Sequence, residues 1–379
     1  MRRADLPQQA PRKSRLVVVA AGLAAASPLA AQEMSFEEYE PKSSLVVPAH
    51  PVPRARYPFV DVHNHQWGEL TPARVDSLVA AMDRLNLAVM VNLSGGTGDS
   101  LAAKVRATEG RYPGRFVTFA NLDFTGFDDP GWGERAARHL AEDVRRHGAR
   151  GLKIYKNLGL DLRDREGRRI PTDDSRLDPV WRTAGELGIP VLIHTGEPRP
   201  FFEPHDRHNE RWLELKQYPN RARPPERYPA WEQVMAEQHN VFRKHRGTTF
   251  IAAHLGWMGN DLARLGRLLD EHPNVYTEVA AVVAELGRQP RFAREFFIRY
   301  QDRILFGKDL WAEAEYPTYF RIFETADEYF DYFRKRHAFW KMYGLDLPQE
   351  VLRKLYYTNA LRIVPGIDRG RFPAAAAGR

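Results

Sequence analysis

The chain has 379 residues, of which 43% are hydrophobic and 28% are charged, and these proportions describe an ordinary globular protein. Its formal net charge is +7, but much of the excess lies in the first 31 residues, and no array of basic and aromatic residues indicates nucleic-acid binding. The chain contains no cysteine, which excludes disulfides and zinc sites built from thiolates.

Residues 1–31 predict a secretory signal peptide. A basic region up to Arg15 precedes the apolar residues 16–26, and the small residues Ala30 and Ala31 suit cleavage near Gln32. An uncleaved anchor is the alternative, although the apolar stretch is shorter than the roughly 20 residues that span a bilayer. We therefore expect an exported protein, periplasmic or secreted, with no stable membrane span after cleavage.

Residues 58–366 predict one domain in which strands and helices alternate. Most of the candidate strands are predominantly apolar, as in parallel strands that are buried on both faces. The candidate strands are residues 59–63, 88–93, 116–122, 151–155, 191–194, 249–253, 275–279 and 304–306. Stretches with a 3.6-residue apolar period predict helices at residues 71–85, 133–147, 178–187, 231–245, 260–271, 290–300 and 348–363.

Eight strands in sequence predict an α/β fold, a TIM-like (β/α)8 barrel. A doubly wound open sheet is the alternative, but no glycine-rich phosphate fingerprint follows the first strand. The loops after strands 5 and 8, residues 196–246 and 311–348, are long enough to shape a substrate pocket. Residues 32–57, with four prolines, predict an extended N-terminal arm, and residues 367–379 predict a flexible tail.

Histidine and aspartate side chains follow four of the predicted strands. His63 and His65 lie two residues apart at the end of the first strand, so both rings leave it on one side. His194, His254 and Asp309 end the fifth, sixth and eighth strands. Taken alone, each of these residues could equally be a buried histidine or a helix cap. Barrel enzymes, however, place their catalytic residues at the carboxyl ends of the strands. The set together predicts an active site.

Three imidazoles and a carboxylate are ligands that suit a divalent ion, with Zn²⁺ expected first and Mn²⁺ or Fe²⁺ as alternatives. A catalytic site of this kind leaves a coordination position for water and lowers the pKa of that water toward about 7. A further histidine nearby could accept its proton.

Four motifs occur in order, and together they resemble the amidohydrolase superfamily. They are DVHNH at 61–65, IHTG at 193–196, AHLG at 253–256 and LFGKD at 305–309, and TNALR at 358–362 resembles the terminal helix of that family. The chain looks most like the branch that includes metal-dependent hydrolases and aminocarboxymuconate-semialdehyde-type decarboxylases.

The resemblance implies a role for each residue at the strand ends. His63, His65 and His194 would be metal ligands, and Asp309 would be a ligand or would orient the water. His254 would be the base or the polarising group beside the metal.

Two lysine positions bear on this pattern. Lys308 stands where the family commonly has a small residue, and it could bind a substrate carboxylate or pair with Glu197 or Glu278. Binuclear members carry a carboxylated lysine on the fourth strand, where Lys153 and Lys156 are rival candidates. We expect a single ion, with Lys153 as the candidate bridge should a second ion bind.

The predicted function is that of an exported metal-dependent hydrolase, in which activated water attacks an amide, ester or lactone and His254 or Asp309 moves protons. The alternatives are a metal-dependent non-oxidative decarboxylase of a small carboxylic acid and a metal-holding binding protein without turnover. We expect a small-molecule substrate, no nucleic-acid partner and, as an open prediction, a homodimer. Candidate substrate contacts, chosen by position alone, are Lys156, Glu197, Lys308 and Trp311.

Overall fold

The computed structural model describes residues 34–337 and 339–373. The chain divides into a short unit that ends at Ser43 and a second unit, from Ser44 onward, that contains every described helix and strand. The predicted signal peptide lies outside the described residues, as do residues 374–379 of the predicted tail. In the part of the chain that is described, no helix is long and apolar enough to cross a membrane.

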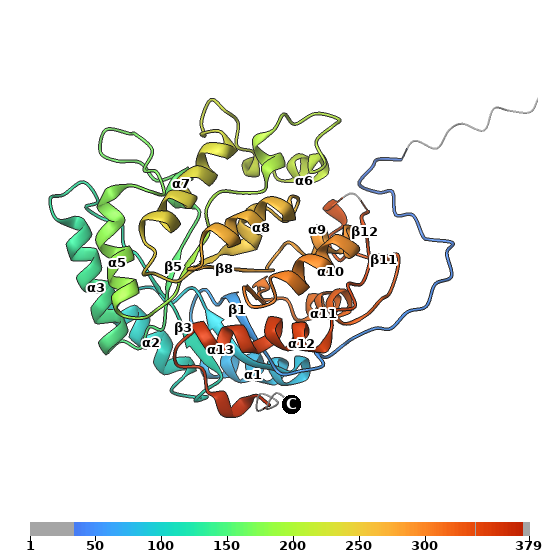
Figure 1. Ribbon diagram of the computed structural model, residues 1–379, viewed down its shortest axis with the longest axis horizontal. Helices are drawn as coiled ribbons and strands as arrows, with labels where there is room; N and C mark the ends of the chain where they lie inside the picture. Colours follow the sequence, from blue (N-terminus) through green and yellow to red (C-terminus); the bar gives the residue numbers. More distant parts are fainter. Residues whose placement is uncertain (1–33, 338, 374–379) are drawn as a thin grey trace, which may run out of the picture. The chain divides into compact units, whose positions relative to one another are not determined.

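The core of the second unit is formed by two sheets of parallel strands, which lie among the helices (Figure 1). Strand β1 pairs with β2 and β10, β2 pairs with β3, and each strand from β4 to β9 pairs with the next. The strands are β1 Phe59–His65, β2 Leu87–Asn92, β3 Phe116–Thr118, β4 Ala120–Asn121, β5 Leu152–Ile154, β6 Val191–Ile193, β7 Phe250–Ala252, β8 Val275–Glu278, β9 Ile304–Leu305 and β10 Asp309–Leu310.

The predicted strand at residues 116–122 is split into β3 and β4, and the predicted strand at residues 304–306 is followed by a further short strand, β10. Only Phe119 separates β3 from β4, and only residues 306–308 separate β9 from β10. The chain passes from one sheet to the other through these two stretches, and within each sheet the strands are parallel. This order is that of the predicted TIM-like (β/α)8 fold, and the fold class is confirmed.

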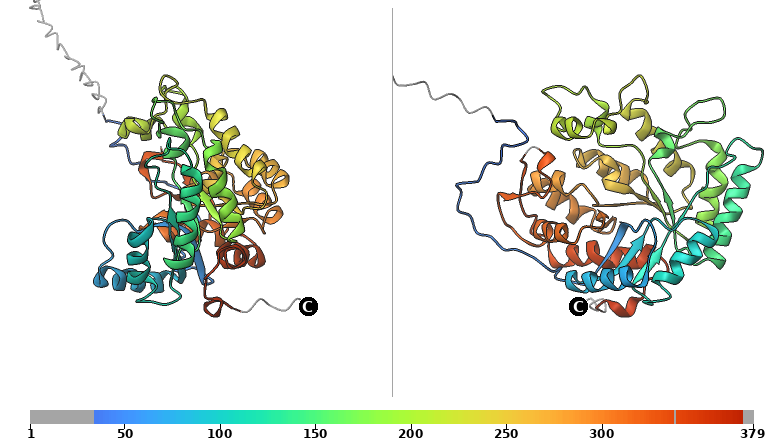
Figure 2. Two further views of the ribbon diagram at one scale, coloured as in Figure 1. Left: turned by 90° about the vertical axis from the view of Figure 1, so that its left-hand side faces the viewer. Right: turned by 180° about the vertical axis from the view of Figure 1, so that it is seen from behind.

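Helices cover the outside of the strands (Figures 1 and 2). They are α1 Pro72–Leu85, α2 Gly98–Thr108, α3 Trp132–Arg146, α4 Asn157–Leu160, α5 Asp178–Glu186, α6 Trp212–Gln217, α7 Trp231–Lys244, α8 Leu262–Glu271, α9 Val283–Arg288, α10 Pro290–Arg299, α11 Tyr316–Glu324, α12 Gln349–Arg353 and α13 Asn359–Ile363. A wider helical turn, Lys354–Thr358, joins α12 to α13.

Local sequence explains where these helices begin and end. In α1, the Thr71 side chain accepts a hydrogen bond from the Arg74 N–H, Pro72 occupies the first turn, and Asn86 ends the helix in the left-handed conformation. Helix α2 is absent from the sequence prediction, because it buries only Leu101 and Thr108 and so lacks a regular apolar stripe.

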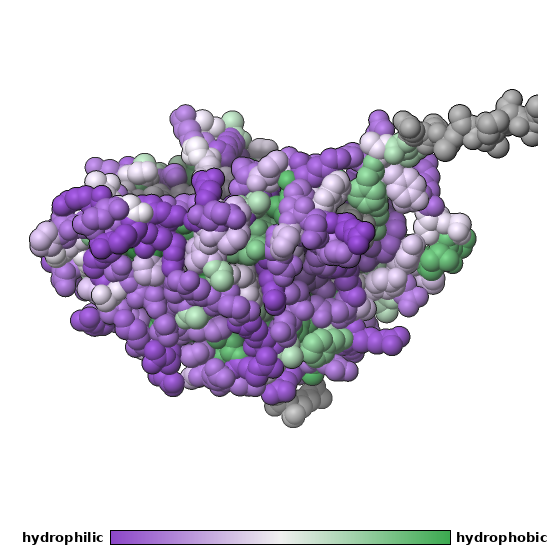
Figure 3. Space-filling view, turned by 90° about the horizontal axis from the view of Figure 1, so that it is seen from above, coloured by the Kyte–Doolittle hydropathy of each residue, from purple (hydrophilic) through white to green (hydrophobic). Residues whose placement is uncertain are grey.

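The two long loops contain secondary structure of their own. The loop after β6 carries α6, and the segment after β10 carries α11 and an antiparallel pair, β11 Phe330–Asp331 with β12 Lys341–Met342. Seen from above, the surface is mainly hydrophilic, with small hydrophobic patches (Figure 3). Residues 34–57 form no helix or strand. Within the predicted tail, Phe372 is buried against Tyr357.

Candidate metal centre and its cavities

Three side chains from separate strand ends converge in one place. Ligand atoms of His63, His254 and Asp309 all lie within 4.8 Å of one another. His63 Nε2 lies 3.5 Å from Asp309 Oδ1, and His65 Nε2 lies 3.7 Å from the same oxygen. The ring of His194 lies 4.5 Å from the ring of His254, centroid to centroid. The structure therefore brings together all five side chains that the sequence placed at strand ends.

Hydrogen bonds fix the orientation of the histidine rings. His63 Nδ1 lies 2.8 Å from Glu278 Oε1, and His254 Nδ1 donates to the carbonyl of Ala280 at 2.7 Å. His65 Nδ1 lies 2.8 Å from Ser94 Oγ. Each of these bonds occupies Nδ1 and leaves Nε2 available to the centre, which is how outer partners hold the histidine ligands of metal sites.

Two backbone features support this arrangement. His254, Leu255 and Trp257 all have left-handed φ angles, of 58°, 55° and 56°, and Asp309 has φ 81°. Such conformations are costly for residues other than glycine and persist where the surrounding structure imposes them, often at functional sites. A Cβ on Gly307 would lie 2.5 Å from Glu278 Oε2 and 2.9 Å from His63 Cβ, so only glycine lets the chain pass here.

Burial keeps the imidazoles neutral. It is the main cause that lowers the pKa of His63, His65, His194 and His254. Burial also acts to raise the pKa of Asp309, but the neighbouring imidazoles outweigh it, and the pKa of that carboxyl is lowered. Near pH 7 the group is therefore a set of neutral imidazoles around a carboxylate.

The donor set fits a divalent ion. Nε2 of His194 and Nε2 of His254 are buried and have no hydrogen-bond partner, a state that costs free energy unless something binds there. Neutral imidazole nitrogens and one carboxylate oxygen are the ligands that Zn²⁺ and Mn²⁺ accept.

Lys153 points into this centre, and Lys156 does not. The Lys153 side chain is buried on β5, with Nζ 3.3 Å from His63 Nε2, and burial lowers the pKa of its amine to about 7. Lys156 Nζ lies 2.5 Å from Glu197 Oε1, which also accepts a bond from Arg223 at 2.9 Å. Of the two rival lysines, Lys153 is therefore the one whose amine lies beside the centre.

A cavity of about 150 Å³ adjoins the centre. His194, His254 and Asp309 line it together with charged residues from the two long loops. Five of its lining residues are cationic and three are carboxylates, so the cavity carries net positive charge: Lys156, Arg211, Arg221, Arg334 and Arg336 against Glu197, Glu214 and Asp309. This balance favours an acidic ligand.

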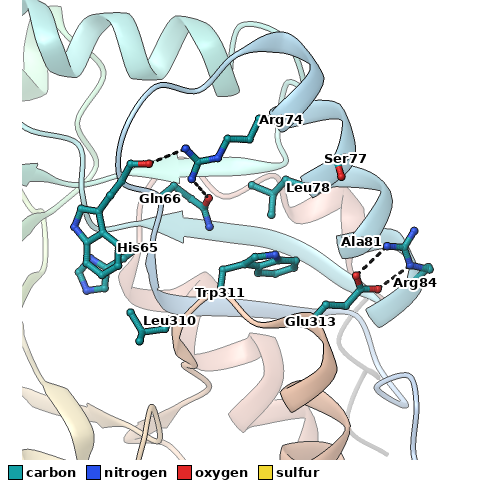
Figure 4. Close-up of a pocket in the computed structure, with 11 residues that line it drawn as sticks. His65, Gln66, Arg74, Ser77, Leu78, Ala81, Arg84, Leu310, Trp311 and Glu313 are labelled. Atoms are coloured by element: carbon teal, nitrogen blue, oxygen red, sulfur yellow. Dashed lines mark hydrogen bonds and ion pairs between the residues drawn. The ribbon is translucent and has the colours of Figure 1, made fainter. Parts of the chain in front are cut away.

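A second cavity, of about 570 Å³, meets the centre at His65 and shares Leu310 with the first. Trp311 lines it opposite residues of α1, and Arg74 donates to Gln66 on its rim (Figure 4). Lys308 lines neither cavity. Its buried Nζ lies 2.5 Å from Glu315 Oε2, so the sequence-based pairings with Glu197 and Glu278 do not form.

Three residues with contacts at the site were missed by the sequence analysis. Ser94 lies two residues after the end of β2, a position that strand-end reasoning could have singled out. Trp257 lies three residues after His254, and its ring stacks on that imidazole at 4.5 Å. Arg334 lies far along the loop after β10, where no local signal links it to the centre.

Comparisons with known proteins agree with this geometry. The sequence profile of the family described as Amidohydrolase matches residues 53–366. A search of curated proteins found no match.

Solved structures share the fold at low sequence identity. A TIM-barrel protein from Bordetella bronchiseptica is 15% identical, covers 82% of this chain and 99% of its own, and has a TM-score of 0.51. The 2,6-dihydroxybenzoate decarboxylase from Rhizobium is 14% identical, covers 81% of this chain and 98% of its own, and has a TM-score of 0.52. A dihydroxybenzoic acid decarboxylase from Polaromonas, with bound manganese and 2-nitroresorcinol, is 16% identical, covers 81% of this chain and 96% of its own, and has a TM-score of 0.51.

Proposed function

Because the chain belongs to the amidohydrolase family, we propose that it is a metal-dependent enzyme that removes carbon dioxide from a small carboxylic acid without an oxidant. The observation that carries this proposal is the net positive cavity beside the His63, His254 and Asp309 group. Two similar folds, those of the Rhizobium and Polaromonas proteins, are decarboxylases of dihydroxybenzoic acids, which supports the same choice. Export through residues 1–31 is part of the proposal.

We assign His63, His65, His194 and Asp309 as the ligands of one divalent ion, Mn²⁺ or Zn²⁺. When bound, such an ion supplies a Lewis acid that stabilises negative charge developing on the substrate. Lys153 remains the bridging candidate for a second ion, and metal analysis with intact-mass measurement of the holoprotein would detect both the second ion and a carboxylated lysine.

His254 is proposed as the proton carrier. Its Nδ1 is committed to the Ala280 carbonyl, and so Nε2 holds the lone pair. In decarboxylation, Nε2 would first take up the proton of the substrate's carboxyl group. The carbon–carboxyl bond would then break with its electron pair left on the carbon, and Nε2 would return the proton to that carbon to form the new C–H bond.

Hydrolysis of an amide, ester or lactone is the second candidate, because the same Nε2 could instead accept a proton from water. Assays of metal-loaded protein in D₂O separate the two. With hydroxybenzoic acids, we expect carbon dioxide release and one deuterium in the product. Conversion of lactones or amides without carbon dioxide release would favour hydrolysis.

The role of His254 predicts a clear variant phenotype. His254→Asn should lower kcat by about 10² to 10⁴, the usual contribution of acid–base catalysis, while the bound metal is retained. Metal content by mass spectrometry and the rate of carbon dioxide release check both parts. His139→Asn, an exposed histidine on α3, is the matched control. Loss of the metal in His254→Asn would instead identify His254 as a ligand.

A further inference from the structure

Four of the five cations that line the smaller cavity each have a carboxylate within ion-pair distance. Lys156 pairs with Glu197 at 2.5 Å, Arg211 with Glu214 at 2.9 Å, and Arg336 lies 3.5 Å from Glu214. Arg221 also pairs with Glu214. Each of these side chains is thus held by a carboxylate and has a reduced capacity to bind a second anion.

Arg334 is different. Among the described residues, no carboxylate lies within ion-pair distance of its guanidinium, and no hydrogen bond from its side chain is found. The charges of Glu315 and Asp309 reach it only at longer range. Its guanidinium instead lies 5.4 Å from the ring of Phe333, the preceding residue. Of the five cations in this cavity, it is the one without an adjacent carboxylate, whereas Arg211, Arg221 and Arg336 share Glu214.

A second hydrogen-bond donor without a partner lies at the same cavity. The indole of Trp257 lines this cavity, and its buried Nε1 has no hydrogen-bond partner. Buried donors are nearly always bonded in folded proteins, so an unpaired one beside a cavity indicates a missing acceptor. A charged donor and a neutral donor together call for an oxygen that carries negative charge, and the planar guanidinium matches a carboxylate in particular.

We infer that the substrate carries a second acidic group, which stays on the product, and that Arg334 binds it with the help of Trp257. The inference rests on the proposed function, since it assumes that the reacting carboxylate lies at the His63, His254 and Asp309 group. Arg334 would then determine specificity for dicarboxylic acids over monocarboxylic acids of the same shape.

Binding of simple acids tests the inference without turnover. Isothermal titration of manganese-loaded protein would compare isophthalate with benzoate and glutarate with butyrate. In the wild type, at least one dicarboxylate should bind about tenfold or more tightly than its partner, as expected for one charge-assisted hydrogen bond. Arg334→Gln should remove that preference and leave monocarboxylate binding unchanged.

Two further variants keep the result interpretable. Arg334→Lys retains the charge but not the planar fork, and it should show a preference between those of the wild type and Arg334→Gln. Arg182→Gln, an exposed arginine on α5, should behave as the wild type. Equal binding of both acids of each pair by the wild type, or a preference that survives in Arg334→Gln, would overturn the inference. The two proposals can fail separately. If the binding preference is absent, carbon dioxide release would still support the proposed decarboxylation, and if no carbon dioxide is released, the dicarboxylate preference can still be measured.

Discussion

At the scale of single residues, the centre depends on buried side chains that hold its histidines and the neighbouring backbone in place. Glu278 is the main example, because its carboxylate accepts from the His254 backbone N–H at 2.7 Å and lies 2.8 Å from His63 Nδ1. Asp61 plays a similar part, since it accepts from the Tyr316 hydroxyl at 2.7 Å and from the Lys308 N–H at 3.0 Å. Two buried acids therefore hold the ends of β1, β7 and the segment before β10 in one place.

Ser94 offers a test of such support. Its hydroxyl is the only partner found for His65 Nδ1 among the described residues, so Ser94→Ala should free that ring and weaken metal binding about tenfold. Competition with a chromophoric chelator measures the affinity. Ser77→Ala, an exposed serine on α1, serves as the control. Unchanged affinity in Ser94→Ala would show that the ring is held by packing against Trp67, at 4.6 Å, instead.

At the scale of elements, the segment between β9 and β10 is closely packed against neighbouring strands at Gly307. Gly307→Ala would drive a methyl group into Glu278 and His63, at a cost of about 1 to 3 kcal/mol in the free energy of unfolding. We expect a lower Tm and reduced metal content. A Cβ on Gly247 meets no atom within 4 Å, so Gly247→Ala is the matched control. Equal Tm values for the two variants would contradict this packing argument.

Sequence patterns predicted most elements because apolar runs and helical stripes record burial directly. They placed His63, His194 and His254 at strand ends, where apolar residues stop and a histidine follows. The sequence did not decide whether Lys153 or Lys156 points into the centre. In the structure β5 ends before Tyr155, so that Lys153 lies on the strand and Lys156 lies beyond it. The role of Arg334 could not be predicted, because it depends on which acids the folded loops bring to the other cations.

At the scale of the whole molecule, stability should depend on pH through a group remote from the centre. Burial raises the pKa of Glu109 from 4.5 to about 7. The folded state thus holds this proton more tightly than the unfolded state. Its stabilising contribution is complete below about pH 4.5 and is lost as the pH rises through about 7.

Glu109→Gln should escape this loss because it never ionises. Relative to the wild type, its free energy of unfolding should rise by about 1 to 2 kcal/mol between pH 5 and pH 8. Urea unfolding at both pH values measures the difference. Glu142→Gln, exposed on α3, should show no such change. A constant difference between Glu109→Gln and the wild type at both pH values would refute the assignment.

The side chains of the candidate metal centre and the cavity walls have separate origins in the chain. The former lie on strands or within two residues of a strand end, whereas Glu214, Arg221 and Arg334 come from the two long loops. Substituting Glu214, Arg221 or Arg334 would therefore change the cavity wall without removing a side chain of the candidate metal centre. Related enzymes are expected to diverge first in these two segments, and new acid specificities can be sought by exchanging them between relatives.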